Sequence, residues 1–215
     1  MKSIVDEPDT SKFVREITEF DFSLSREAQT QLIQYVELLY KWNQVYNLTG
    51  LRKKFQMYTY HVLDSLSILP ELAGVSCLAD VGCGGGMPGI PLTIAKPEMS
   101  VTLIDASSKK MAFIRQVIAE IGLKNATAVQ GRVEVLQDLK FEVIVSRAFA
   151  ELGEFVRVTK QLLADGGCWL AMKGTYPYEE LSQLPEWIIL DEVKSIYVPG
   201  LNAQRHLVRL SCHKG

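Results

Sequence analysis

The sequence predicts an α/β protein in which a mostly parallel sheet is covered by helices on both faces. Short, mostly apolar runs alternate with segments of helical periodicity over residues 77–172, an order typical of parallel sheets. These runs lack a clean apolar–polar alternation, as expected for strands that are buried on both sides. The last two strand candidates are joined through Pro199 and Gly200 without a helix, which predicts an antiparallel hairpin at one edge of the sheet.

Helices are expected before the sheet. Ser25 can cap a helix whose apolar residues recur at helical spacing as far as Tyr46. Asn47 and Gly50 then mark a turn.

A second helix is expected over residues 55–69, and Pro70 should end it. Residues 1–70 are therefore expected to form an N-terminal helical extension that packs on a core of residues 71–215.

The core contains seven predicted strands and three predicted helices. The strands are expected at residues 77–81, 101–105, 126–130, 141–146, 168–172, 188–197 and 206–212. The helices are expected at residues 88–96, 107–121 and 151–163, the second ended by Gly122 and the third by the Asp-Gly-Gly of residues 165–167.

The composition is that of a folded protein. Hydrophobic residues make up 47% and charged residues 22%, which excludes disorder of the whole chain. No run approaches the ~20 apolar residues of a membrane span, so we expect no membrane association. The charged first residues, interrupted by Pro8, are not expected to form a secretory signal. None of the four cysteines forms a CxxC pair, which favours a reduced, cytoplasmic protein.

The strongest motif is a glycine-rich loop over residues 80–89, DVGCGGGMPG, which follows the first core strand and opens a helix. Ligands bind at such carboxyl ends of strands in open α/β sheets, and glycine lets the backbone approach a ligand closely. Asp105 ends the next strand, where its carboxylate can accept hydrogen bonds from both ribose hydroxyls. The loop and Asp105 together predict a nucleoside-type cofactor.

Two cofactors compete for this loop. Residues 84–89 satisfy GxGxxG, so the pattern alone does not reject NAD. A pyrophosphate needs free N–H groups at the helix N-terminus, however, and Pro88 and Pro91 remove two of them. S-adenosylmethionine has no phosphate, and no second domain that could hold a hydride acceptor is evident, so S-adenosylmethionine is favoured.

Other blocks of the chain accompany this loop. They are WNQVYNLT at residues 42–49, HVLDS at 61–65, GRVE at 131–134, SRAF at 146–149 and MKG at 172–174. Together with the loop, they resemble the bacterial small-subunit ribosomal RNA methyltransferase G family, also called glucose-inhibited division protein B. The resemblance spans roughly residues 32–210.

The resemblance implies a class I, Rossmann-like methyltransferase that depends on S-adenosylmethionine. The implied reaction is methylation of N7 of guanine 527 in 16S rRNA, in the 30S subunit or its assembly precursor. By position, Gly82 and Met87 are implied to line the methionine and ribose side of the cofactor, and Val133 and Glu134 to approach the adenosine. The rest of the expected cofactor site is Asp80, Gly84, Gly86, Asp105 and Arg147.

Guanine N7 has a free lone pair, so the site needs positioning and no general base. Methyltransferases that act on exocyclic amines carry Asn/Asp-Pro-Pro-aromatic after the fourth strand, whereas residues 146–149 read Ser-Arg-Ala-Phe. Arg147 is the predicted catalytic residue. It can donate to guanine O6, to an RNA phosphate or to the cofactor carboxylate, and the sequence does not choose among these.

Several basic residues are candidates for contact with RNA phosphates. They are Lys173, Arg205, Arg52, Lys53 and Lys54. His61 and Asp64, one helical turn apart, resemble two metal ligands, but no third ligand is evident, so we predict a hydrogen-bonded pair and no metal site.

The expected enzyme acts as a monomer. Two other functions stay open: methylation of another RNA, a small molecule or a protein, and a non-catalytic nucleotide-binding RNA module.

Overall fold

A seven-stranded sheet forms the centre of the protein. The computed structural model describes residues 8–19, 24–147 and 149–213. The strand order is β3-β2-β1-β4-β5-β7-β6, in which β7 runs antiparallel to both of its neighbours and the other pairings are parallel. The strands are β1 (Cys77–Val81), β2 (Ser100–Asp105), β3 (Ala126–Gln130), β4 (Phe141–Arg147), β5 (Leu163–Lys173), β6 (Ile188–Ser195) and β7 (His206–Cys212). The predicted mostly parallel sheet with an antiparallel edge hairpin is confirmed.

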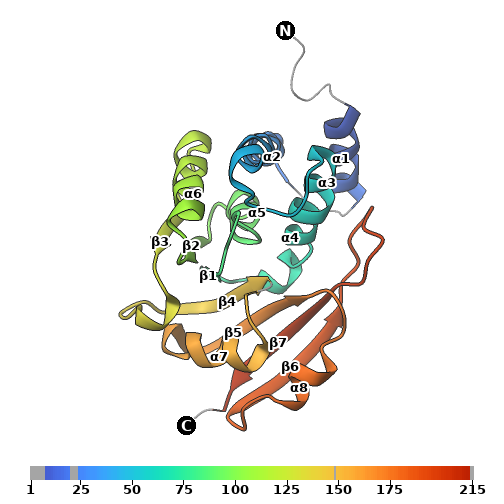
Figure 1. Cartoon of the computed structure of the whole chain (residues 1–215). Coiled ribbons are helices and arrows are strands. Elements are labelled where there is room, and N and C mark those ends of the chain that lie inside the picture. The colour runs from blue at the N-terminus through green and yellow to red at the C-terminus, as the bar shows by residue number, and fades with distance from the viewer. Residues whose placement is uncertain (1–7, 20–23, 148, 214–215) are drawn as a thin grey trace.

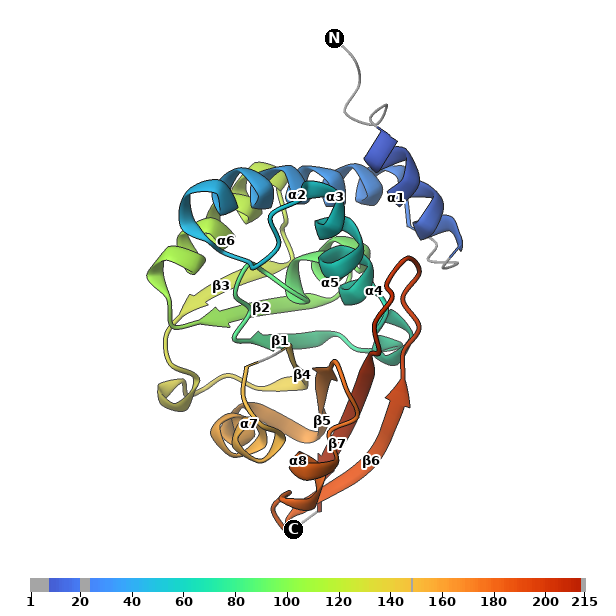
Figure 2. The ribbon, with the colours of Figure 1, turned by 45° about the vertical axis from the view of Figure 1, so that its right-hand side comes forward.

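Helices cover both faces of the sheet, as Figures 1 and 2 show. On one side lie α1 (Pro8–Glu19), α2 (Arg26–Tyr46), α3 (Lys54–Met57), the π-helix η2 (Tyr58–Leu63), α4 (Asp64–Leu66), α5 (Gly89–Ala95) and α6 (Ser108–Ile121). On the other lie α7 (Leu152–Thr159) and α8 (Tyr178–Ser182). Short 3₁₀ turns add η3 (Leu69–Leu72), η4 (Val133–Val135) and η5 (Lys160–Leu162). Among the described residues, no helix combines the length and apolar character needed to cross a membrane.

Each face of the sheet has its own hydrophobic core. One core joins Phe13 of α1 and Leu32 of α2 to Leu78 of β1, so the N-terminal helices and the sheet bury apolar surface together. The other core is centred on Trp169 of β5, whose indole N–H donates to the hydroxyl of Thr159 at 2.8 Å. The central strands β1, β2 and β4 are largely buried on both sides, as expected, whereas the edge strands β3 and β6 are partly exposed. The expected boundary near residue 70 stays a prediction.

The predicted start and end of α2 agree with the structure. The Ser25 hydroxyl accepts a hydrogen bond from the backbone N–H of Ala28 at 3.1 Å. Asn47 ends the helix in the left-handed conformation, with φ of 50°.

The predicted helix over residues 55–69 is present as an uninterrupted helical run over Lys54–Leu66, but its middle is a π-helix and it ends before Pro70. The segment consists of α3, the π-helix η2 and α4, and Pro70 lies inside η3 instead of ending a helix. The apolar spacing does not reveal the wider π turn, because one extra residue per turn changes the periodicity very little over a short segment.

The boundary between α7 and β5 was also predicted wrongly. The α-helix ends at Thr159, and β5 begins at Leu163 and runs through the Asp-Gly-Gly of residues 165–167. Gly166 has φ of 76°, and a Cβ on Gly167 would lie 2.8 Å from the Glu142 carbonyl oxygen. These glycines allow an irregular strand beside β4, where pairing shifts register, instead of ending an element. The helices α1 and α8 were not predicted from the sequence.

Candidate functional site

The glycine-rich loop after β1 has a backbone that only glycine adopts easily. Gly82, Gly84 and Gly86 have φ of 70°, 56° and 92°. A Cβ on Gly82 would lie 2.5 Å from the Phe149 ring, so the chain passes directly beneath that aromatic side chain. The loop is thereby held against the segment that follows β4.

Asp80 supports the loop from below. It is fully buried, and its Oδ2 accepts a 2.7 Å hydrogen bond from the backbone N–H of Gly89 at the start of α5. Burial raises the pKa of Asp80 to about 7. Because a carboxylate of the chain already takes this N–H, and Pro88 and Pro91 have none, the first turn of α5 is poorly suited to a pyrophosphate.

Asp105 stands at the carboxyl end of β2 and fixes the loop from the other side. Its Oδ2 accepts from the backbone N–H of Gly84 at 3.0 Å, and its Oδ1 accepts from that of Ser107 at 2.8 Å. Lys110 of α6 adds an ion pair at 3.5 Å. These bonds hold the carboxylate at the rim of a cavity.

That cavity has a volume of about 390 Å³. It is lined by Val81, Gly82, Ile104, Asp105, Ala106, Lys110, Gly131, Arg132, Val133, Glu134 and Phe149. Four of the predicted cofactor residues, Gly82, Asp105, Val133 and Glu134, are thus brought together. The buried Val133 gives an apolar wall that suits a base, and Asp105 gives acceptors that suit ribose hydroxyls.

The other predicted cofactor residues lie outside this lining. Asp80 and Gly86 are buried under the loop, and Gly84 contributes its N–H to Asp105. The Met87 sulfur instead lies 3.2 Å from Nη2 of Arg147. Direct contact of these residues with a cofactor stays a prediction.

The Arg147 guanidinium lies at the carboxyl end of β4 and is surrounded by groups from the π-helix and α4. Its Nη1 donates to the Tyr60 carbonyl oxygen and to Oδ2 of Asp64, both at 3.0 Å. Its Nη2 lies 3.3 Å from Nδ1 of His61. The π turn leaves the Tyr60 carbonyl available to a side chain, which fits the frequent occurrence of π-helices at functional sites.

His61 is buried beside Arg147. Burial first, and then the Arg147 charge, lower the pKa of His61 to about 3. Its Nε2 lies 2.7 Å from the Thr49 hydroxyl. The predicted hydrogen bond between His61 and Asp64 is wrong, because Asp64 instead accepts hydrogen bonds from Arg147 and Arg205. Among the described residues, no three His, Cys, Asp or Glu side chains are grouped as a metal site would require.

Arg147 opens onto a second cavity, of about 290 Å³. It is lined by Leu51, Tyr60, His61, Asp64, Arg147, Met172, Lys173, Gly174 and Arg205. Two of the predicted RNA contacts, Lys173 and Arg205, therefore lie with Arg147. Lys173 forms a 2.7 Å ion pair with Glu180 and donates to the Ala150 carbonyl, so it also ties down the chain after β4.

The three basic residues of the 52–54 segment do not line this second cavity, although the preceding Leu51 does. Arg52 and Lys53 are exposed, and Arg52 donates to the Asn47 side chain at 2.6 Å. Lys54 forms a 2.7 Å ion pair with Glu37 of α2. Contact of the three residues with RNA stays a prediction.

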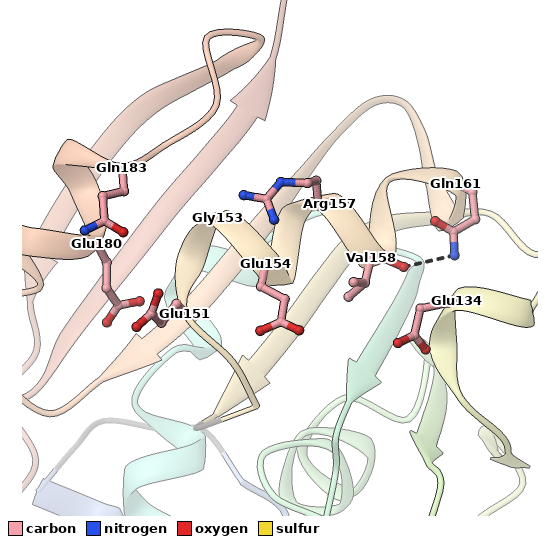
Figure 3. Close-up of a pocket in the computed structure, with 9 residues that line it drawn as sticks. All are labelled: Glu134, Glu151, Gly153, Glu154, Arg157, Val158, Gln161, Glu180 and Gln183. Atoms are coloured by element: carbon pink, nitrogen blue, oxygen red, sulfur yellow. Dashed lines mark hydrogen bonds between the residues drawn. The ribbon is translucent and has the colours of Figure 1, made fainter.

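A larger hollow of about 660 Å³ lies over α7 and α8. Figure 3 shows that Glu134, Glu151, Glu154 and Glu180 line it, with Arg157 as its one basic lining residue. Four carboxylates repel phosphate, so this hollow is poorly suited to binding a nucleic acid. The basic second cavity is the opposite in charge.

Seven residues that line the first cavity were not predicted from the sequence, and Lys110 and Phe149 are among them. Phe149 stands two residues after Arg147 in the SRAF block, and this position alone was a usable signal. The bridging role of Asp64 had no signal, because its partners are 83 and 141 residues away in the chain.

Comparisons with known proteins find relatives over most of the chain. The profile of a family described as rRNA small subunit methyltransferase G matches residues 28–208. A relative from Laribacter hongkongensis, named ribosomal RNA small subunit methyltransferase G, is 54% identical over 90% of this chain and 94% of its own. A relative of the same name from Neisseria meningitidis serogroup B (strain MC58) is 49% identical over 91% and 94%. The crystal structure of a SAM dependent methyltransferase from Aquifex aeolicus, 16% identical, covers 69% of this chain and 90% of that one with a TM-score of 0.56.

Proposed function

Because the chain belongs to the rRNA small subunit methyltransferase G family, we propose that it methylates small-subunit ribosomal RNA with S-adenosylmethionine as the methyl donor. The proposed target atom is N7 of guanine 527 in 16S rRNA, which the sequence blocks imply. The proposed enzyme works as a monomer in the cytoplasm, on the 30S subunit or its assembly precursor.

The observation that carries this proposal is that two residues of the SRAF block, two positions apart, line the two cavities. Phe149 lines the cavity with Asp105, and Arg147, two residues earlier, lines the basic cavity. Met87 of the glycine-rich loop contacts Arg147. A nucleoside held at Asp105 and a base held at Arg147 would therefore meet at the end of β4.

The residues present fit the proposed cofactor. Asp105 would accept hydrogen bonds from the ribose, Val133 would pack on the adenine, and Gly82 would allow close approach of the backbone. When bound, S-adenosylmethionine supplies an electrophilic methyl group on a sulfonium. The chain itself has to orient the guanine and to exclude water.

The titratable groups around the site favour an atom that needs no deprotonation. His61 is neutral at physiological pH, but both of its ring nitrogens already lie within hydrogen-bond distance of protein groups. Asp80 is fully buried under the loop. Neither group is placed to take a proton from RNA, and neutral guanine N7 has none to lose.

Charge favours approach of RNA from the second cavity. Arg147, Lys173 and Arg205 line that cavity, whereas four glutamates line the hollow over α7 and α8. In an A-form duplex, N7 lies in a deep, narrow groove that side chains cannot enter. The proposed substrate is therefore a loop or a folded ribonucleoprotein, and not a regular duplex.

The deciding experiment is methyl transfer from labelled S-adenosylmethionine to 30S subunits that lack the modification, with the modified nucleotide mapped. We expect label at N7 of guanine 527. Label at another RNA position would refute the finer proposal. Tight cofactor binding without transfer to naked RNA, assembly precursors or subunits would favour a non-catalytic RNA-binding module.

The pH dependence of the same reaction tests the atom. Single-turnover rates with saturating cofactor and RNA should be nearly flat from about pH 6.5 to 8.5, where a general base would show its titration. A tenfold rise traced by mutation to His61 or Glu134 would mean that a proton is removed, and the N7 assignment would then be withdrawn.

A further inference from the structure

We infer that Asp64 is a positioning residue that holds Arg147 and Arg205 together at the wall of the second cavity, so that both guanidiniums are placed for the RNA. This inference rests on the proposed function. It concerns a side chain that the reaction itself would not touch.

The geometry is that of one carboxylate shared by two arginines. Oδ2 of Asp64 accepts from Nη1 of Arg147 at 3.0 Å, and Oδ1 accepts from Nε of Arg205 at 2.6 Å. Arg147 ends β4, and Arg205 directly precedes β7. Because β5 lies between these two strands in the sheet, Asp64 is the group that links the two guanidiniums across it.

The Asp64 carboxylate is much more deeply buried than the two arginines that it binds. The Asp64 side chain is 2% exposed, whereas each arginine side chain is 21% exposed. RNA in the cavity can therefore reach the guanidiniums, while the carboxylate behind them is shielded. Hydrogen bonds between charged groups are short and directional, so they fix the planes of both guanidiniums.

The charge balance leaves the pair attractive to RNA. One carboxylate neutralises one of the two arginines, and the neighbouring His61 is neutral because burial and Arg147 lower its pKa to about 3. Lys173, which also lines the cavity, is paired with Glu180. A surplus positive charge therefore faces the cavity. The buried Asp64 carboxylate holds the two guanidiniums side by side, because its negative charge offsets their mutual repulsion.

Asp64→Asn is the sharpest change, because it alters neither the size nor the shape of the side chain. The amide oxygen can accept from one arginine only, and the amide N–H₂ would oppose the other guanidinium. One arginine loses its anchor, and the net charge beside the cavity rises. Asp64 does not line the cofactor cavity, so cofactor binding should be unaffected.

The experiment measures methyl transfer to unmodified 30S subunits by full-length wild-type and Asp64→Asn protein. We expect kcat to fall by about 10- to 100-fold, because small misplacements of an orienting group cost this much. The affinity for S-adenosylmethionine should change less than about threefold, and a thermal melt should show a folded variant. Glu71→Gln, which removes the ion pair with Lys194 away from both cavities, should keep wild-type kcat.

A double variant separates positioning from a merely structural effect. If Asp64 acts through Arg147, Asp64→Asn should lower kcat much less in an Arg147→Ala background than in the wild type. Equal losses in both backgrounds would overturn the inference. The inference would also be overturned if Asp64→Asn kept the wild-type kcat, or if it lost affinity for S-adenosylmethionine while kcat stayed unchanged.

Arginine NMR of the wild-type protein tests the contact without any activity. The Nε–H of Arg205 should exchange with solvent at least about tenfold more slowly than that of the exposed Arg115. Exchange as fast as in Arg115 would overturn the inference even if Asp64→Asn does not fold. If wild-type protein transfers no methyl group but the protection is present, the proposed function fails and the Asp64 contact stands.

Discussion

The backbone N–H of Gly89 donates a 2.7 Å hydrogen bond to Oδ2 of Asp80, so a carboxylate of the chain closes the first turn of α5. Among the described residues, the other oxygen, Oδ1, has no hydrogen-bond partner. The glycine-rich loop is therefore held by a buried acid whose ionisation is costly.

Asp80 should make stability depend on pH. Burial raises its pKa from 3.8 to about 7, so its contribution to stability is fully present below about pH 4 and is lost as pH rises through about 7. Asp80→Asn should remove this loss. Relative to wild type, the variant should gain a few kcal/mol of unfolding free energy between pH 4 and 7.5, because each pKa unit corresponds to about 1.4 kcal/mol. Urea unfolding at several pH values measures the difference.

Asp138→Asn is the control, because Asp138 is exposed and its positive φ also suits asparagine. The unfolding free energy of Asp138→Asn should differ from that of the wild type by the same amount at every pH. A constant offset between Asp80→Asn and wild type from pH 4 to 7.5 would contradict the prediction.

His61 should act in the opposite sense. Its pKa is lowered from 6.5 to about 3, so its contribution to stability is present above about pH 6.5 and is lost as pH falls through 3. His61→Gln should be less stable than wild type at pH 7.5, and the gap in unfolding free energy should narrow by pH 4. His213→Gln, at an exposed histidine, should show no such convergence. A gap that stays constant with pH would show that the buried imidazole is not linked to acid unfolding.

Asp105→Ala should weaken binding of S-adenosylmethionine and of its demethylated product. The expected loss is about 1–3 kcal/mol, because buried ribose hydroxyls would lose their acceptor. Calorimetry measures both ligands, with NAD as the comparison that should bind poorly to wild type. Glu98→Ala, at an exposed carboxylate, should leave cofactor affinity unchanged. Tight NAD binding without S-adenosylmethionine binding would reverse the assignment of the cavity.

Arg147→Ala should impair methyl transfer more than folding. The guanidinium lines the basic second cavity, so we expect kcat to fall by about 100-fold or more while the protein still melts cooperatively. A thermal melt and a methylation assay on the same preparation check this, with Arg157→Ala over α7 as the matched control. Normal turnover together with a greatly lowered melting temperature would make Arg147 a structural residue.

Local signals predicted most of the fold. Ser25 and Asn47 mark the ends of α2, and the seven apolar runs mark all seven strands, because caps and buried strands depend on residues close in sequence. The local signals did not show the π turn within the helical run of residues 54–66, and they did not show that residues 165–167 belong to a strand. A π turn and an irregular strand both depend on what packs against them, namely the Arg147 side chain and the neighbouring β4.

The candidate site also has one part that the sequence predicted and one part that it did not. The sequence by itself determined the glycine-rich loop, the carboxylate at the end of β2 and the arginine at the end of β4, because parallel strands bring their carboxyl ends to one edge. Only the tertiary structure decided that Asp80 closes α5 and that Phe149 covers Gly82. It also decided that Asp64 joins Arg147 to Arg205, because a buried carboxylate takes whichever donors the packed strands present, however distant in sequence.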